Sequence, residues 1–131
     1  MYKHITNLLL LSAMVAALGC TPGKPEPTRV DVTGQVLIDG KPLDKGLIHF
    51  KTVSAGSIDS LDIVDGKFAG KVEPGSRRVE IAAFRPAAGG TPGMDAGEVN
   101  YIPAKYNSSS KLTADVTEAG PNDFKFDVTA K

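Results

Sequence analysis

The chain has 131 residues, of which 15 are basic and 15 acidic, so its formal net charge at neutral pH is zero. This balance excludes the polyelectrolyte contacts by which strongly basic proteins bind nucleic acids, and we expect no nucleic-acid partner. A single cysteine excludes an intramolecular disulfide, and the length suits one domain.

The N-terminus carries a short apolar run, Leu8 to Cys20, which follows Lys3 and closes on Ala-Leu-Gly-Cys. The run is shorter than the roughly 20 residues that span a bilayer, so it is predicted to be an export signal and not a permanent span. It resembles the bacterial lipoprotein signal, in which a small residue precedes an invariant cysteine that receives diacylglycerol before cleavage. We expect residues 1–19 to be removed and Cys20 to carry the lipid; the alternative is an ordinary secretory signal that contains a thiol.

Residues 20–28 are predicted to form the lipidated cysteine and a linker. Three prolines between Thr21 and Thr28 favour polyproline II, which gives a semi-rigid spacer of roughly 25 Å. Removing residues 1–19 removes one basic residue, Lys3, and no acidic residue, so the membrane affinity must come from the lipid. We expect an exported protein anchored to a bacterial membrane and facing the periplasm or the cell exterior. The resemblance to lipoproteins favours the outer membrane, because Thr21 stands where an Asp would retain the protein on the inner one.

The remaining residues, 29–131, alternate with the period of two that is typical of strands. Residues 30–38 are predicted to be a strand with alternate valines inward, and Gly34 marks a bulge or a close backbone approach. The Asp39-Gly40 turn is expected to lead into an antiparallel return strand, 47–53, with Ile48 and Phe50 inward and His49 on the opposite face.

Further turn signals separate the rest of the domain into strands. Residues 58–64 and 67–72 are expected to pair across an Asp-Gly turn, and a Pro-Gly turn at 74–75 leads into a strand over 77–84. Residues 111–117 and 123–129 complete the set, on either side of a turn at 118–122. These seven short strands predict an all-β fold, a β-sandwich of two packed sheets. The side chains expected to face its core include Val79, Ile81, Ala83, Phe124, Phe126 and Val128.

The turn and core residues resemble those of carboxypeptidase regulatory-like domains. The resemblance is carried by Val32-Thr33-Gly34-Gln35-Val36, Asp39-Gly40-Lys41-Pro42-Leu43, Gly66-Lys67-Phe68 and Val72-Glu73-Pro74-Gly75. With Ile102-Pro103-Ala104-Lys105-Tyr106-Asn107 and Asn122-Asp123-Phe124, the chain is similar to small planctomycete-type lipoproteins that carry one such domain. The resemblance implies a seven-stranded transthyretin-like (prealbumin, Ig-like) sandwich over residues 29–131 and a domain that supplies no catalytic groups.

The residue inventory argues against an enzyme. His49 is the only histidine after residue 19, and neither a Gly-x-Ser-x-Gly turn nor a cysteine nucleophile is present in the domain, so no catalytic residue is assigned. Asp59, Asp62 and Asp65 could suggest calcium, but in a strand Asp62 points away from the other two. One histidine and no domain thiol cannot build a closed zinc site. We expect no metal and no cofactor.

Residues 85–100 form the longest stretch without periodicity, and it contains four glycines. A loop of this length either binds a partner or is an excursion without a role. If it binds, Arg85, Met94 and Tyr101 are the expected contacts, because these residue types contribute strongly to interfaces. The sequence therefore favours a non-enzymatic, lipid-anchored interaction or structural module whose partner is an envelope protein or glycan. The alternative is a carbohydrate- or peptide-binding lipoprotein serving an envelope transporter or enzyme, although the chain has no Trp for sugar stacking.

Overall fold

The computed structural model describes residues 19, 23, 25–52, 54, 56–89 and 97–131. Strands dominate these residues, and one short 3-10 turn, η1 (Ala104–Tyr106), interrupts them. The predicted all-β, sandwich-like class is confirmed. The strands are β1 (Val30–Ile38), β2 (Lys41–Pro42), β3 (Lys45–Lys51), β4 (Ile58–Val64), β5 (Lys67–Val72), β6 (Gly75–Ala82), β7 (Phe84–Pro86), β8 (Glu98–Asn100), β9 (Leu112–Val116) and β10 (Asp123–Val128).

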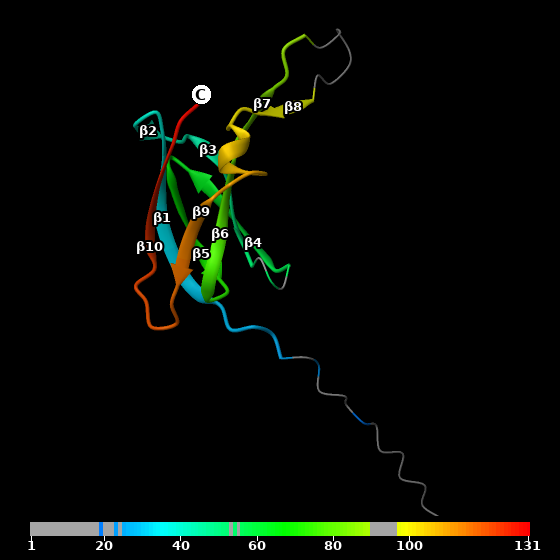
Figure 1. The fold of residues 1–131 in the computed structure, drawn as a ribbon, viewed down its shortest axis with the longest axis vertical. Coiled ribbons are helices and arrows are strands. Elements are labelled where there is room, and N and C mark those ends of the chain that lie inside the picture. Colours follow the sequence, from blue (N-terminus) through cyan, green and yellow to red (C-terminus); the bar gives the residue numbers. More distant parts are fainter. Residues whose placement is uncertain (1–18, 20–22, 24, 53, 55, 90–96) are drawn as a thin grey trace, which may run out of the picture.

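The longer strands form one curled sheet in the order β10-β1-β5-β4-β3-β6-β9, and β2 adds to β1. Neighbours along this path are antiparallel except β1 and β10, which are parallel and place the last strand beside the first. Strands β7 and β8 form a separate two-stranded ribbon that extends away from the curled sheet (Figure 1). The sheet curls around a single core to which nearly every long strand contributes.

Alternation decides which side chains enter this core. In β1, Val32 and Val36 are buried while Asp31, Thr33 and Gln35 are exposed, as predicted. Four phenylalanines from three strands meet in the core, with neighbouring ring centroids 6.0–6.4 Å apart, within the range of favourable aromatic pairs. They are Phe50, Phe68, Phe124 and Phe126. Each fully buried ring contributes about 1.5–3 kcal/mol by leaving water.

The two Asp-Gly turns are present as predicted. Asp39 and Gly40 have φ values of 49° and 79°, and Asp65 and Gly66 have 51° and 75°, which is the double positive φ of a tight hairpin turn. The prediction that the strand after the first turn returns alongside β1 is wrong. Only the short β2 pairs with β1, whereas β3 spans Lys45–Lys51 and pairs with β4 and β6.

Leu43 explains why the return strand changes partner. Its side chain is buried, its N–H donates to Val36 O, and its carbonyl accepts from Gly66 N–H. The chain is therefore held at Leu43 while it crosses from β1 to the other part of the sheet. The expected hairpin of β4 and β5 has the predicted bounds but pairs only at Val64 and Lys67, because the two strands then diverge. The side chain of Leu61 packs in the gap, where a Cβ on Gly70 would lie 2.2 Å from it.

Asn122 fixes the turn that precedes β10. Its side chain accepts the N–H of Thr117 at 2.8 Å and donates to the carbonyls of Thr117 and Asp31. The turn at 118–122 is therefore present as expected, but it links opposite ends of the curled sheet, since β9 pairs with β6 and β10 with β1.

Replacing Gly34 by Ala is expected to destabilise the domain by about 1–3 kcal/mol, the usual cost of overpacking. A Cβ at this position would lie 2.2 Å from Phe124 O and 2.3 Å from the Phe68 ring, so the close approach predicted from the sequence is confirmed. Urea unfolding measures the change, with Gln35→Ala, at an exposed neighbouring position, expected to stay within about 0.5 kcal/mol. Equal stability of the two variants would contradict this account of the glycine.

Candidate functional site

The stretch predicted to be an irregular loop begins and ends in strands. Phe84 pairs with Asn100, Arg85 with Val99, and Pro86 with Glu98, so the prediction of a loop over 85–100 is wrong at both ends. The Asn100 side chain closes the base of this ribbon, because its Oδ1 accepts the N–H groups of Ala83 and Ile102. We call residues 84–86 and 98–100 the β7–β8 ribbon. Met94, the second expected contact, lies outside the described residues.

The other two expected contacts come together at the base of the ribbon. The Arg85 guanidinium carbon lies 5.7 Å from the centroid of the Tyr101 ring, a cation–π distance. The Tyr101 side chain is half-buried against the core, and the backbone N–H of this residue donates to Ala83 O. Arg85 is exposed. Tyr101 therefore holds Arg85 in place more than it offers a free surface.

The exposed apolar surface of the ribbon belongs to two residues that were not predicted. Phe84 is 49% exposed and Val99 is 43% exposed. A signal for Phe84 was present, because it is out of phase with Val79, Ile81 and Ala83 and must therefore face outward. Phe84 also lines a pocket of about 260 Å³ where the ribbon diverges from the sheet; the other lining residues are Lys45, Gly46, Leu47, Asp62 and Glu98.

The ribbon and the N-terminal linker lie at opposite ends of the sheet. Val30 pairs with Val72, close to the start of β6, so the linker joins the domain where β6 begins. The ribbon follows the other end of β6, eight residues later, a separation of roughly 25 Å at the rise of a strand. Figure 1 shows the chain before β1 leaving one end while β7 and β8 project from the other.

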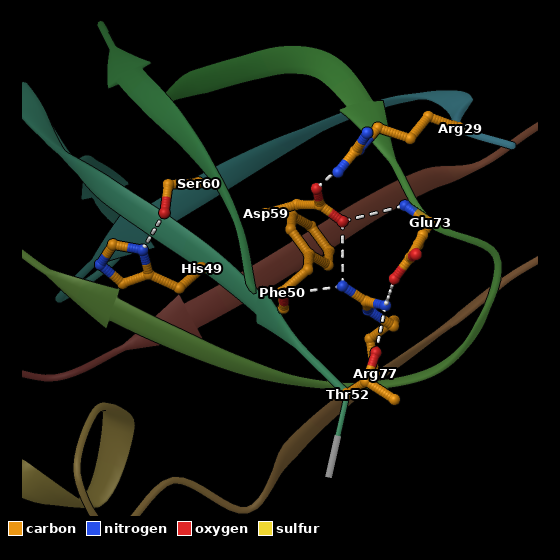
Figure 2. A network of polar contacts seen from close by, with 8 residues as sticks. All are labelled: Arg29, His49, Phe50, Thr52, Asp59, Ser60, Glu73 and Arg77. Carbon is orange, nitrogen blue, oxygen red and sulfur yellow. Dashed lines mark hydrogen bonds and ion pairs between the residues drawn. The ribbon is translucent and has the colours of Figure 1, made fainter. Parts of the chain in front are cut away.

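A buried ion network closes the linker end of the core (Figure 2). Arg77 and Asp59 are 1% and 7% exposed, and Arg77 Nη2 lies 2.9 Å from Asp59 Oδ2. The same nitrogen donates to Phe50 O at 2.9 Å, and Nη1 donates to Glu73 Oε2 at 3.1 Å and to the hydroxyl of Thr52. Asp59 also accepts the Glu73 N–H at 3.0 Å. Four N–H groups of the guanidinium are therefore paired.

The linker is attached to this network by Arg29. Its Nε donates to Asp59 Oδ1 at 2.9 Å, immediately before β1. A hydrogen bond from the Ser57 hydroxyl, followed by the one from Arg77, lowers the pKa of the Glu73 carboxyl below its ordinary value. The network thus connects the linker, β4 and β6 through charged groups whose partners are largely buried. These contacts fix the position at which the linker enters the domain.

His49 and Ser60 form the pair on the outer face that most resembles a catalytic arrangement. Their side chains are 2.7 Å apart through His49 Nδ1, and Glu80 lies opposite His49 on β6 (Figure 2 shows His49 and Ser60). The Glu80 carboxylate is bound to Lys51 and Arg78, and it makes no hydrogen bond to His49 among the described residues. The outward direction predicted for His49 is confirmed, although its ring is half-buried.

The stability of the domain is expected to fall as the pH drops from about 7.5 to about 5.5. Burial, assisted by the charge of Lys51, holds the pKa of His49 below the ordinary 6.5. The unfolded chain therefore takes up a proton before the folded one does, and stability present above pH 6.5 is lost below it. In the fragment 28–131, His49 is the only histidine, and urea midpoints at the two pH values measure the loss.

His49→Gln is the matched variant for this measurement, because it removes the titrating ring. We expect it to abolish most of the difference between the two pH values. Glu73 and Glu80 do not interfere, since the pKa of each lies below 4.5. An unchanged pH difference in the variant would contradict the assignment to His49.

The three aspartates considered for calcium do not converge. Asp59 is buried in the ion network, whereas Asp62 and Asp65 are exposed. In the described parts of the chain, no group of three His, Cys, Asp or Glu side chains is arranged to hold a metal ion.

No protein-family model, curated protein or solved structure matches this chain. Within the described ranges, no helix has the length and apolar character needed to cross a membrane. Cys20 lies outside the described residues, so its lipidation remains a prediction from the sequence. The β7–β8 ribbon is the candidate binding site that the geometry offers.

Proposed function

We propose that this protein is a non-enzymatic module of the bacterial cell envelope, anchored by lipid on Cys20, which presents the β7–β8 ribbon to a protein partner. The observation that carries the proposal is the position of the ribbon. It lies at the end of the domain opposite the linker, and its exposed side chains include Phe84 and Val99. An anchor at Cys20 would place both side chains away from the bilayer, where a partner can reach them.

The chemistry of the ribbon supports a protein contact. Phe84 and Val99 offer apolar area, and Arg85 offers a fixed positive group that Tyr101 orients. Aromatic and arginine side chains of this kind contribute most to interface energies. Val99 is opposite Arg85 in the register, so Phe84 and Val99 point to opposite faces of the ribbon. An aromatic ring exposed on one face, with arginine and valine on the other, favours a role in recognition.

We further propose that the fold is a seven-stranded transthyretin-like sandwich of the carboxypeptidase regulatory-like kind. The supporting observation is the order of the longer strands, in which β10-β1-β5 and β4-β3-β6-β9 can be read as two layers. The layers are joined by the short contact between Val64 and Lys67. A fold of this kind hosts many functions, so it is compatible with an interaction module but does not specify the partner.

Site-specific photo-cross-linking in the native envelope tests the ribbon. A photoreactive phenylalanine analogue is placed at Phe84 in one variant, at Val99 in a second and, as a control, at the exposed Thr113 of β9 in a third. We expect one discrete adduct from the two ribbon positions and none from Thr113. An adduct from Thr113 of equal yield, or no adduct from either ribbon position, would overturn the proposal.

The second candidate function is peptide or carbohydrate binding at the pocket of about 260 Å³ beside the ribbon. Its lining includes the apolar Leu47 and Phe84 and three charged residues, Lys45, Asp62 and Glu98. This lining suits a short peptide better than a sugar, because the chain has no Trp. Parallel peptide and glycan arrays, repeated with Asp62→Asn, separate this function from the first.

A further inference from the structure

Two cations lie directly opposite each other on the outer face of the sheet. Lys51 of β3 pairs in register with Arg78 of β6. Like charges in this arrangement destabilise a sheet unless a third group compensates them. Glu80 provides the compensation, with its carboxylate 2.6 Å from Lys51 Nζ and 2.5 Å from Arg78 Nη2. One carboxylate between two cations leaves a local surplus of one positive charge.

The buried carboxylate also holds the two cations in place. The Glu80 side chain is 8% exposed, whereas those of Lys51 and Arg78 are 29% and 38% exposed. Burial alone would raise the pKa of Glu80, but Lys51 and Arg78 outweigh it and the pKa is lowered, so the carboxylate is charged at neutral pH. Glu80 uses one donor from each cation, although an ammonium has three and a guanidinium five. Arg78 Nε is buried and has no partner among the described residues.

Lys51 and Arg78 both line a pocket of about 210 Å³. Thr52 adds a hydroxyl that accepts a hydrogen bond from Arg77 and can therefore donate its own proton elsewhere. Ile58 adds apolar surface to the lining and is 55% exposed. The remaining lining residues are Gly56 and Ser57. The lining of the pocket thus combines two fixed cations with a hydroxyl-bearing residue.

We propose that this pocket binds a phosphate group. Phosphate presents several oxygens in different directions, which matches donors that come from Lys51, Arg78 and Thr52 and not from one planar fork. The surplus positive charge favours an anion over a neutral ligand. The pocket lies on the opposite end of the sheet from the β7–β8 ribbon, so this inference does not depend on the proposed partner contact.

The location suggests two sources for the phosphate. Lys51 ends β3 and Arg78 lies near the start of β6, which places the pocket at the linker end of the domain. With an anchor at Cys20 this end would face the bilayer across the linker of roughly 25 Å, so headgroup phosphates are one source. A soluble phosphomonoester would use the same donors. The headgroup is a phosphodiester with one negative charge, so the two sources differ in a way that binding can measure.

The experiment is a titration of the full-length protein in detergent micelles, followed by NMR at constant ionic strength. The probes are inorganic phosphate and glycerophosphoglycerol, the deacylated headgroup of phosphatidylglycerol. We expect saturable shifts of the Thr52, Ser57 and Arg78 signals. Tighter binding of glycerophosphoglycerol assigns a lipid headgroup, and tighter binding of inorganic phosphate assigns a soluble monoester; both support the site.

Matched variants give the decisive comparison. Lys51→Gln and Arg78→Gln, made separately in case one fails to fold, are each expected to weaken phosphate binding about tenfold or more, a loss of about 1.4 kcal/mol. Lys125→Gln, at an exposed position on β10, should bind as the unaltered protein does. Absence of saturable shifts with both probes, or equal weakening by Lys125→Gln, would overturn the proposal.

Discussion

Replacing Asp59 by Ala is expected to destabilise the domain by about 3–5 kcal/mol, the usual cost of removing one partner from a buried ion pair. The substitution leaves the guanidinium of Arg77, which is 1% exposed, without its closest carboxylate, and it frees the N–H of Glu73 and the side chain of Arg29. Chemical denaturation of the fragment 28–131 measures the loss. A cost below about 1 kcal/mol would mean that the network carries little of the fold's stability.

Asp62→Ala is the matched control for this prediction. It removes the same side chain three residues along β4, at an exposed position, and should change stability by no more than about 0.5 kcal/mol. A third variant separates the effect of losing the charges from the effect of losing side-chain volume. The double substitution Asp59→Leu and Arg77→Met removes both charges and keeps apolar volume, so it should recover much of what Asp59→Ala loses.

Replacing Cys20 by Ser is expected to abolish lipid attachment completely, because the thioether requires a thiolate and a hydroxyl is a poor substitute. Without two or more acyl chains, each buried methylene of which is worth about 0.8 kcal/mol, slow release from the membrane is lost. Labelling with a clickable fatty acid measures this directly, and gel mobility reports whether residues 1–19 are still attached. Thr21→Ser should remain labelled, and a labelled Cys20→Ser protein would refute the anchor.

The bounds of several strands could be predicted because local signals agreed. In β1, β4 and β5, alternating apolar residues end or begin at Asp-Gly turns, and the observed bounds match those expected. Pairing could not be predicted in the same way. The strand after Asp39-Gly40 leaves β1 because Leu43 is buried between the two parts of the sheet, and that contact depends on residues distant in the chain. The parallel pairing of β1 with β10 likewise has no local signal.

The ion network was missed although the sequence contained a sign of it. Asp59 is in phase with Leu61 and Ile63, and Arg77 is in phase with Val79 and Ile81, so each charge falls on the inward face of its strand. A charged residue at an inward position is buried only if it is paired. Two inward charges of opposite sign therefore predict a buried ion pair. The ribbon gave a weaker signal, because two three-residue strands are too short for a period to be recognised.

The parallel pairing of β1 with β10 has a consequence for the order in which the chain can fold. Thr33 lies beside Asp123, 90 residues away, so the first strand acquires its outer neighbour only when the end of the chain has been released. Contacts of such large sequence separation form late, because the intervening loop must close first. If the chain is exported with its N-terminus leading, as the signal predicts, β1 would therefore stay without its outer neighbour until the last residues have left the channel.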